Sequence, residues 1–386
     1  MPAVSGRGPA RRGVLYAAAA AGAAAVAATA TDARAAGTTG PARSRWTTSW
    51  ATAQTAPTAT DPVAYAGLTD GDCTSVLRLS AGGAVRLRYA NTFGNAPVLV
   101  GPVTADGRPV TFAGRSQEWL AAGASLTSDP VAGLRVPDGA RLEVRTRVPG
   151  PTGPLSFHRN THAWHTVDGV RTRSVLLLTG VETTGAHGPV VAVFGDSIAE
   201  GVGTPDDADL RWPDQLARRL PGSAVANLGI SGNRLLLDDV RFGPGGQARF
   251  DRDVLGLPGL RTVLVHLGVN DLQQPPGQSG PDQVLAGYRQ LALRARGAGL
   301  RVVGATITPF EGWTRWSPEL DAVRGHINRA VRTGRIFDGV ADFDAAVRDP
   351  DRPSRMLPAH DSGDGLHPGP SGHAALAAAV DRRHLL

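Results

Sequence analysis

The chain has 386 residues, of which 41% are hydrophobic and 19% charged, and this composition excludes a disordered or fibrous protein. All 40 basic residues are arginine; removing the first 35 residues takes away four arginines and Asp32, leaving 36 basic against 33 acidic residues. That excess is too small to indicate a nucleic-acid-binding protein. The single cysteine, Cys73, excludes an internal disulfide framework and a cysteine-based zinc finger.

The first 35 residues have the pattern of an export signal. Arg11-Arg12 precedes an apolar, mostly alanine run at 14–30, and Ala33 and Ala35 fit a signal peptidase site. The arginine pair resembles a twin-arginine signal. A membrane anchor is the alternative, but it needs about 20 strongly apolar residues. We therefore expect a secreted protein with no stable membrane anchor after signal removal, and a linker at 36–45.

Residues 46–185 show the period of two that is typical of β-strands. Apolar and polar residues alternate at 76–80 and 84–89 across Gly82-Gly83, which predicts a hairpin. Asp-Gly pairs at 106–107 and 138–139 precede similar alternations, and no convincing helix is visible. The pattern predicts an antiparallel β-sandwich domain over residues 46–185.

From about residue 186 short apolar runs alternate with helical stretches. At 282–297 the apolar residues lie on one face of a helix. This alternation predicts a parallel sheet with helices on both faces, a three-layer α/β/α domain over residues 186–386. The predicted strands are 190–194, 224–228, 262–267, 301–307 and 340–343.

Polar residues follow the carboxyl ends of these strands, where ligands bind in such sheets. The segments 195–198, 229–233, 268–271 and 361–368 contain a serine, a glycine-rich turn, an asparagine and an Asp-x-x-His pair. A serine hydroxyl needs a base, an orienting acid and donors for an oxyanion to cleave an ester. This inventory therefore predicts a serine hydrolase site.

The chemistry assigns a role to each residue. Ser197 is the candidate nucleophile, His367 its base and Asp364 the acid that orients the imidazole. The backbone N–H groups of Ser197 and Gly232 and the side-chain amide of Asn270 are the candidate oxyanion hole. We expect Asp196 and Asp271 to bond loop backbone. Three other residues compete for these roles: Gly229 with Gly232, Asp361 with Asp364, and His373 with His367.

These residues resemble the SGNH, or GDSL, family of lipases and acylhydrolases. Ser197 stands in the GDS block, Gly232 in the ISGN block, Asn270 in the GVND block and His367 in the D-x-x-H block, all in family order over 189–386. Ile198 replaces the usual leucine of GDSL. Segments 306–312 and 349–355 also resemble secreted bacterial esterases with an N-terminal β domain, some of which deacylate plant polysaccharides. The resemblance implies a flavodoxin-like fold.

Five residues near the predicted strand ends are candidates for the substrate pocket, among them two tryptophans that could stack on a sugar or cover the local core. A cluster of His158, His162 and His165 could bind zinc, but we expect these histidines to lie in loops or at an interface, with no metal. The pocket candidates are Asn233, Pro309, Phe310, Trp313 and Trp316.

The predicted reaction is hydrolysis of a carboxylic ester through an acyl-enzyme, with neither metal nor organic cofactor. Short acyl groups such as acetyl, on a small molecule or a polysaccharide, are the expected substrates. The alternatives are a lipase or phospholipase acting on longer acyl chains, acyl transfer to another acceptor, and a glycan-binding protein whose hydrolase domain is vestigial. The sequence does not indicate an oligomeric state.

Overall fold

A computed structural model describes residues 46–159, 163–277 and 280–385. The predicted export signal at 1–35 and the linker at 36–45 therefore lie outside the described residues. Within the described ranges, no helix has both the length and the apolar character needed to cross a membrane. Two regions are named below: the β part, residues 46–185, and the α/β part, residues 186–385.

The β part is built from antiparallel strands in two larger and two small sheets, with one short helix, α1 (Pro62–Ala66). The first sheet has the order β1 (Thr47–Ala51), β15 (Leu178–Thr183), β3 (Gly83–Ala90), β8 (Ser125–Thr127), and β9 (Arg135–Val136) also pairs with β3. The second has the order β13 (Val170–Thr172), β12 (Trp164–Val167), β2 (Asp70–Arg78), β10 (Arg141–Pro149), β5 (Val103–Ala105), β6 (Arg108–Val110). The small sheets pair β11 (Phe157–His158) with β14 (Val175–Leu176), and β4 (Val98–Val100) with β7 (Glu118–Leu120).

The hairpin predicted across Gly82-Gly83 is wrong, because β2 and β3 belong to different sheets. Leu77 of β2 and Leu87 of β3 nevertheless lie in the same hydrophobic cluster, so the two strands bury their apolar faces in one core. Alternation indicated the buried faces correctly, but the pairing partner depends on distant strands. The antiparallel sheets are present as predicted; that they form an independent β-sandwich domain stays a prediction.

The α/β part contains one parallel sheet whose strands match the predicted apolar runs closely. Its order places the first two strands along the chain in reverse and the other three in sequence, which is the flavodoxin-like order 2-1-3-4-5. The order is β17 (Ala224–Asn227), β16 (Val190–Gly195), β18 (Leu260–His266), β19 (Arg301–Ala305), β20 (Gly339–Ala341).

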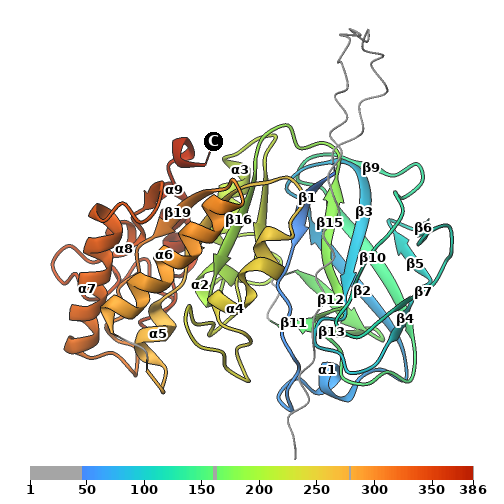
Figure 1. The fold of residues 1–386 in the computed structure, drawn as a ribbon, viewed down its shortest axis with the longest axis horizontal. Helices are drawn as coiled ribbons and strands as arrows, with labels where there is room; N and C mark the ends of the chain where they lie inside the picture. Colours follow the sequence, from blue (N-terminus) through green and yellow to red (C-terminus); the bar gives the residue numbers. More distant parts are fainter. Residues whose placement is uncertain (1–45, 160–162, 278–279, 386) are drawn as a thin grey trace, which may run out of the picture. The chain divides into compact units, whose positions relative to one another are not determined.

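Helices cover both faces of the parallel sheet (Figure 1). Phe194 of β16 faces a cluster that includes side chains of α4, α6 and α7, whereas the adjacent Val193 faces one that includes α3, α8 and α9. This alternation produces the predicted three layers. The helices are α2 (Ser197–Glu200), α3 (Trp212–Arg218), α4 (Gly246–Phe250), α5 (Val269–Gln273), α6 (Pro281–Gly297), α7 (Pro318–Thr333), α8 (Phe343–Val347) and α9 (Pro370–Ala379). A π-helical turn (Asp251–Leu255) extends α4, and a 3-10 turn (Arg382–His384) follows α9.

The two parts pack against each other within one compact unit, residues 44–386. Ala51 and Ala53 of the β part belong to the same hydrophobic cluster as Phe250 and Val254 of the α/β part. The Ser80 hydroxyl donates a hydrogen bond to the carbonyl of Val225 at 3.1 Å. A domain boundary near residue 186 stays a prediction: the β part has a hydrophobic cluster of its own, and Ala51 and Ala53 join the cluster of the α/β part.

Candidate active site

Three short segments at the carboxyl edge of the parallel sheet present the predicted polar residues. Ser197 is the first residue of α2, directly after β16, and the side chain of Asp196 caps this helix by accepting a hydrogen bond from the N–H of Ile198 at 3.0 Å. Gly232 follows β17 with a φ of 75°, and an added Cβ would lie 2.4 Å from the ring of Phe242. Glycine is therefore required there. Asn270 lies in α5, after β18.

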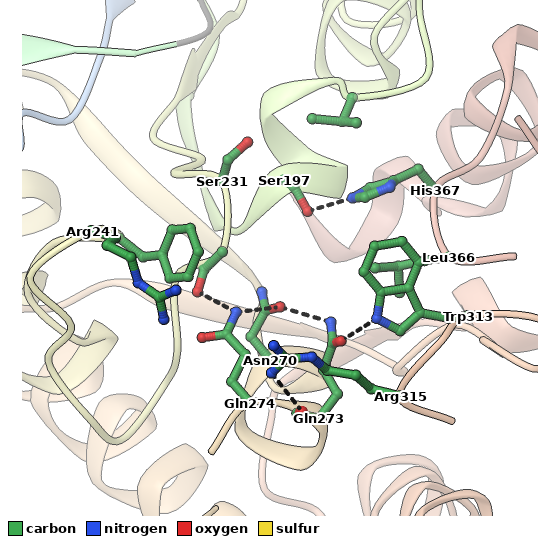
Figure 2. A pocket seen from close by; sticks show the side chains of 13 residues that line it. Ser197, Ser231, Arg241, Asn270, Gln273, Gln274, Trp313, Arg315, Leu366 and His367 are labelled. Carbon is green, nitrogen blue, oxygen red and sulfur yellow. Dashed lines mark hydrogen bonds between the residues drawn. The ribbon is translucent and has the colours of Figure 1, made fainter. Parts of the chain in front are cut away.

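The structure brings Ser197, His367 and Asp364 into one hydrogen-bonded chain. The Ser197 Oγ lies 2.9 Å from the His367 Nε2, and the His367 Nδ1 lies 2.6 Å from the Asp364 Oδ2 (Figure 2 shows the first contact). The side chains come from segments 170 residues apart. This is the arrangement that lets an imidazole remove a hydroxyl proton while a carboxylate holds its other nitrogen.

Asp364 is held as a carboxylate by the loop around it. Desolvation raises its pKa, but hydrogen bonds from the side chain and backbone of His367 and from the N–H of Leu366 outweigh that effect, so the pKa lies well below its usual range. The Asp364 Oδ1 accepts from these two N–H groups at 2.8 and 2.9 Å. An anionic partner keeps the Nδ1 of His367 protonated, which leaves Nε2 with the lone pair that faces Ser197.

The side-chain amide of Asn270 is oriented by its neighbours. Its Oδ1 accepts hydrogen bonds from the Nε2 atoms of Gln273 and Gln274, both at 3.0 Å, and its Nδ2 donates to the carbonyl of Asn233 at 3.0 Å. An amide nitrogen carries two hydrogens, so one N–H of Asn270 has no partner among the described residues. Gln274 also donates to the carbonyl of Gly232 at 3.0 Å and so links two of the predicted oxyanion donors.

The backbone N–H groups of Ser197 and Gly232 likewise donate no hydrogen bond within the described part of the chain. Both residues line one cavity with Asn270 and His367. Two backbone donors and one amide donor beside a nucleophile can stabilise a tetrahedral oxyanion.

The cavity has a volume of about 250 Å³, and its lining differs from the predicted pocket. Trp313 lines it as predicted, with its ring edge-on to His367 at 6.0 Å between centroids. The other four candidates do not line it: Phe310 is buried in the core, and Trp316 packs against the same cluster. Pro309 and Asn233 are buried as well. The lining also includes residues that were not predicted: Val202, Ser231, Arg241, Phe242, Gln273, Gln274, Arg315 and Leu366 (Figure 2).

Arg249 is a further structural residue that the sequence did not reveal. Its fully buried guanidinium donates to the carbonyls of Gly195 and Leu228, both at 2.9 Å, and to the Oδ1 of Asn233 at 2.9 Å. It thereby ties together the ends of β16 and β17 and the turn beside Gly232. Burial lowers the pKa of Arg249 to about 10, and Asp253 at 3.2 Å opposes that shift.

The competing residues are occupied elsewhere. The N–H of Gly229 donates to the side chain of Asn227 at 3.0 Å, and Asp361 accepts from the N–H groups of Gly363 and Gly365. His373 is buried between the N–H of Trp212 and the carbonyl of Val202, each at 3.2 Å. Burial lowers the pKa of His373 to about 4.

The histidines of the β part do not form a metal site among the residues that the structure describes. No group of three or more His, Cys, Asp or Glu side chains in those ranges could hold a metal ion. The Nδ1 of His158 contacts the carbonyl of Ala53 at 2.7 Å, and the Nδ1 of His165 contacts the Ser75 hydroxyl at 2.8 Å. His162 lies outside the described residues.

Comparisons with known proteins found a matching family model and several similar solved structures. Residues 193–375 match the model of the GDSL-like lipase/acylhydrolase family. Similar solved structures include a GDSL-like lipase from Bacteroides thetaiotaomicron VPI-5482 (18% identity, 50% of this chain and 87% of that one, TM-score 0.39). An aryl esterase from M. smegmatis has 19% identity over 52% of this chain and 100% of that one, with a TM-score of 0.41. A carbohydrate acetylesterase from Sinorhizobium meliloti has 18% identity over 50% of this chain and 96% of that one, with a TM-score of 0.39. A search of curated proteins found no match.

Proposed function

We propose how this chain, which belongs to the GDSL-like lipase/acylhydrolase family through residues 193–375, acts as a serine ester hydrolase. Ser197 is the nucleophile, His367 is the general base, and Asp364 is the acid that orients the base. The observation that carries this assignment is the continuous chain of hydrogen bonds from the Ser197 Oγ to Asp364, at 2.9 and 2.6 Å, beside the cavity.

The proposed reaction has two halves. The Ser197 Oγ attacks the ester carbonyl carbon while its proton passes to the His367 Nε2, and the carbonyl oxygen becomes an oxyanion facing the N–H groups of Ser197, Gly232 and Asn270. The intermediate then collapses: the carbon–oxygen bond to the alcohol breaks, and His367 protonates the departing oxygen. Water attacks the acyl carbon with His367 again as base. The bond from that carbon to the Ser197 Oγ then breaks, His367 returns the proton to Oγ, and the carboxylic acid leaves.

The proposed substrates carry short acyl groups such as acetyl, attached to carbohydrate. A cavity of about 250 Å³ is small beside the roughly 300–1,000 Å³ of pockets that hold drug-sized ligands. Its wall carries the rings of Trp313 and Phe242, against which a sugar can stack, beside the polar side chains of Ser231 and Gln273. The proposed site of action is outside the cell, on the evidence of the signal pattern at residues 1–35.

The nucleophile is tested with the Ser197→Ala variant on p-nitrophenyl acetate. We expect kcat to fall by about 10³-fold or more, because without the hydroxyl no acyl-enzyme forms. The matched control is Ser125→Ala, which removes an exposed serine of β8 and should leave kcat unchanged. Turnover retained by Ser197→Ala would show that another group is the nucleophile.

The acyl group is tested with p-nitrophenyl esters of two to twelve carbons together with acetylated xylan. We expect kcat/KM to be highest for acetyl or propionyl and to decline with longer chains, since the cavity has little room for them. Release of acetate from xylan should accompany this profile. A maximum at eight or more carbons, with no acetate released from xylan, would favour the lipase alternative instead.

A further inference from the structure

A buried pair of ionisable side chains joins the β part to the helix that carries Ser197. His158 is the last residue of β11, and Glu200 is the last residue of α2, one helical turn after Ser197. The His158 Nε2 lies 3.3 Å from the Glu200 Oε1, and the two side chains are only 5% and 2% exposed. The catalytic arrangement described above uses neither residue.

The two side chains meet at ion-pair distance without forming a hydrogen bond, and the contact on the other side of the imidazole shows how the ring is held. The His158 Nδ1 lies 2.7 Å from the carbonyl oxygen of Ala53, which can only accept, so Nδ1 carries a hydrogen. The Nε2 atom would then face Glu200 with a lone pair unless one of the two groups also holds a proton. Both carboxyl oxygens of Glu200 lack a hydrogen-bond partner in the described part of the chain, and the imidazole of His158 lies within ion-pair distance of Oε1. A buried carboxyl group without a hydrogen-bond partner is costly, so Glu200 depends on its electrostatic contact with the imidazole.

Two other side chains near the pair have hydrogen-bond partners of their own. Arg211 binds the carboxylate of Asp214 through two hydrogen bonds of 2.7 and 2.8 Å, and His165 contacts the Ser75 hydroxyl. The imidazole of His158 is within ion-pair distance of Glu200, and Arg211 adds a longer-range electrostatic attraction to that carboxyl group.

The position of Glu200 is coupled directly to that of Ser197, because α2 is a single turn. The N–H of Glu200 donates to the carbonyl of Asp196 at 2.9 Å, and the N–H of Gly201 donates to the carbonyl of Ser197 at 2.9 Å. On the neighbouring strand, the Asn227 amide donates to the carbonyl of Ala199 at 2.7 Å. A shift at the end of this turn would therefore move the Ser197 backbone, including one proposed oxyanion donor.

We infer that His158 is a positioning residue for the nucleophile: through Glu200 it fixes the short helix α2, and the β part thereby helps to set the geometry of the active site. This inference rests on the proposed role of Ser197. It assigns the β part a contribution to catalysis that requires no contact with substrate.

Two substitutions at residue 158 distinguish the contact of His158 with Glu200 from its contact with Ala53. The amide nitrogen of glutamine can occupy the place of Nε2, and that of asparagine the place of Nδ1. His158→Gln keeps a donor for Glu200, whereas His158→Asn keeps only the bond to Ala53. On p-nitrophenyl acetate we expect His158→Asn to lower kcat roughly 10- to 100-fold with little change in KM, as small displacements of reacting groups can do. We expect His158→Gln to stay within about threefold of wild type, a difference below one order of magnitude.

The same comparison is made from the other side of the pair. Glu200→Gln retains a group that can donate to the His158 Nε2, so its kcat should stay close to that of wild type. Glu200→Ala removes that group, and its kcat should fall. His165→Asn is the control for loss of a buried imidazole from the β part, and should leave kcat near wild type. Thermal unfolding of each variant detects misfolding, and the rate at which a fluorophosphonate labels Ser197 detects mispositioning of the nucleophile.

The outcomes are distinct. Equal kcat in His158→Asn and wild type would overturn the inference, and so would equal losses in His158→Asn and His158→Gln. Either result leaves the proposed function intact if Ser197→Ala is inactive. If wild type and Ser197→Ala hydrolyse the ester equally, the proposed function itself fails.

Discussion

Asp196 and Asp271, which adjoin the proposed catalytic residues Ser197 and Asn270 in sequence, are buried carboxyl groups that accept hydrogen bonds from the backbone of the loops. Burial raises the pKa of Asp196 to about 7, although the hydrogen bond from Ile198 partly opposes the shift. Burial likewise raises the pKa of Asp271 to about 6, opposed by the N–H groups of Leu235 and Leu236. Each aspartate accepts hydrogen bonds from a loop backbone as expected, but its burial disfavours the ionised form of the carboxyl group.

This burial predicts a pH dependence of stability. Between about pH 4 and 7 the folded state keeps the Asp196 proton that the unfolded state releases, so the free energy of unfolding of wild type should fall as pH rises through that window. Asp196→Asn cannot ionise and can still accept from Ile198. At about 1.4 kcal/mol per pKa unit, it should gain on the order of 2–4 kcal/mol relative to wild type from pH 4 to 8.

The measurement is urea unfolding of both proteins at several pH values across that range. Asp282→Asn, which neutralises an exposed aspartate of α6, is the control and should follow the wild-type curve. A constant difference between Asp196→Asn and wild type at every pH would show that Asp196 ionises as easily in the folded state as in the unfolded chain.

At the scale of strands and helices, prediction from sequence succeeded for strands that are buried on both faces, because such a strand requires a run of apolar residues. The parallel strands appear as uninterrupted apolar runs, so β16 was expected at 190–194 and is observed at Val190–Gly195. The pairing of strands in the β part was harder to predict from the sequence. The Gly82-Gly83 connection looks like a hairpin turn, yet β2 pairs with β10 and β12 while β3 pairs with β15.

The same distinction applies to the active site. Residues with characteristic chemistry at strand ends, Ser197 and His367 among them, could be brought together from the topology alone. Residues that act by supporting others could not. Gln274 follows the Asn270 motif without a pattern of its own, and Arg249 is one of 40 arginines. Phe310 was expected in the pocket because it follows β19, but its side chain turns into the core.

At the scale of the whole molecule, hydrogen bonds, ion pairs and a small apolar cluster join the β part to the α/β part. The N–H of Thr48 donates to the carbonyl of Pro258 at 2.9 Å, and Ala81 shares a small hydrophobic cluster with Val190 and Ala224. Asp209 pairs with arginines of both β2 and β10, at 3.2 and 3.0 Å. Separating the two parts would expose apolar surface and leave His158 and Glu200 without their partners.

We therefore predict that both parts unfold together. The single cysteine, Cys73, reports on the β part: it is buried in β2, and burial raises the pKa of its thiol to about 12, so the native thiol should react slowly. Hydrolysis of p-nitrophenyl acetate reports on the α/β part. In a urea series, brief thiol labelling and loss of activity should share one midpoint, because the buried contacts between the two parts make them unfold cooperatively. Labelling of Cys73 at urea concentrations that leave full activity would instead show that the β part unfolds independently, and that Ser197 keeps its geometry without it.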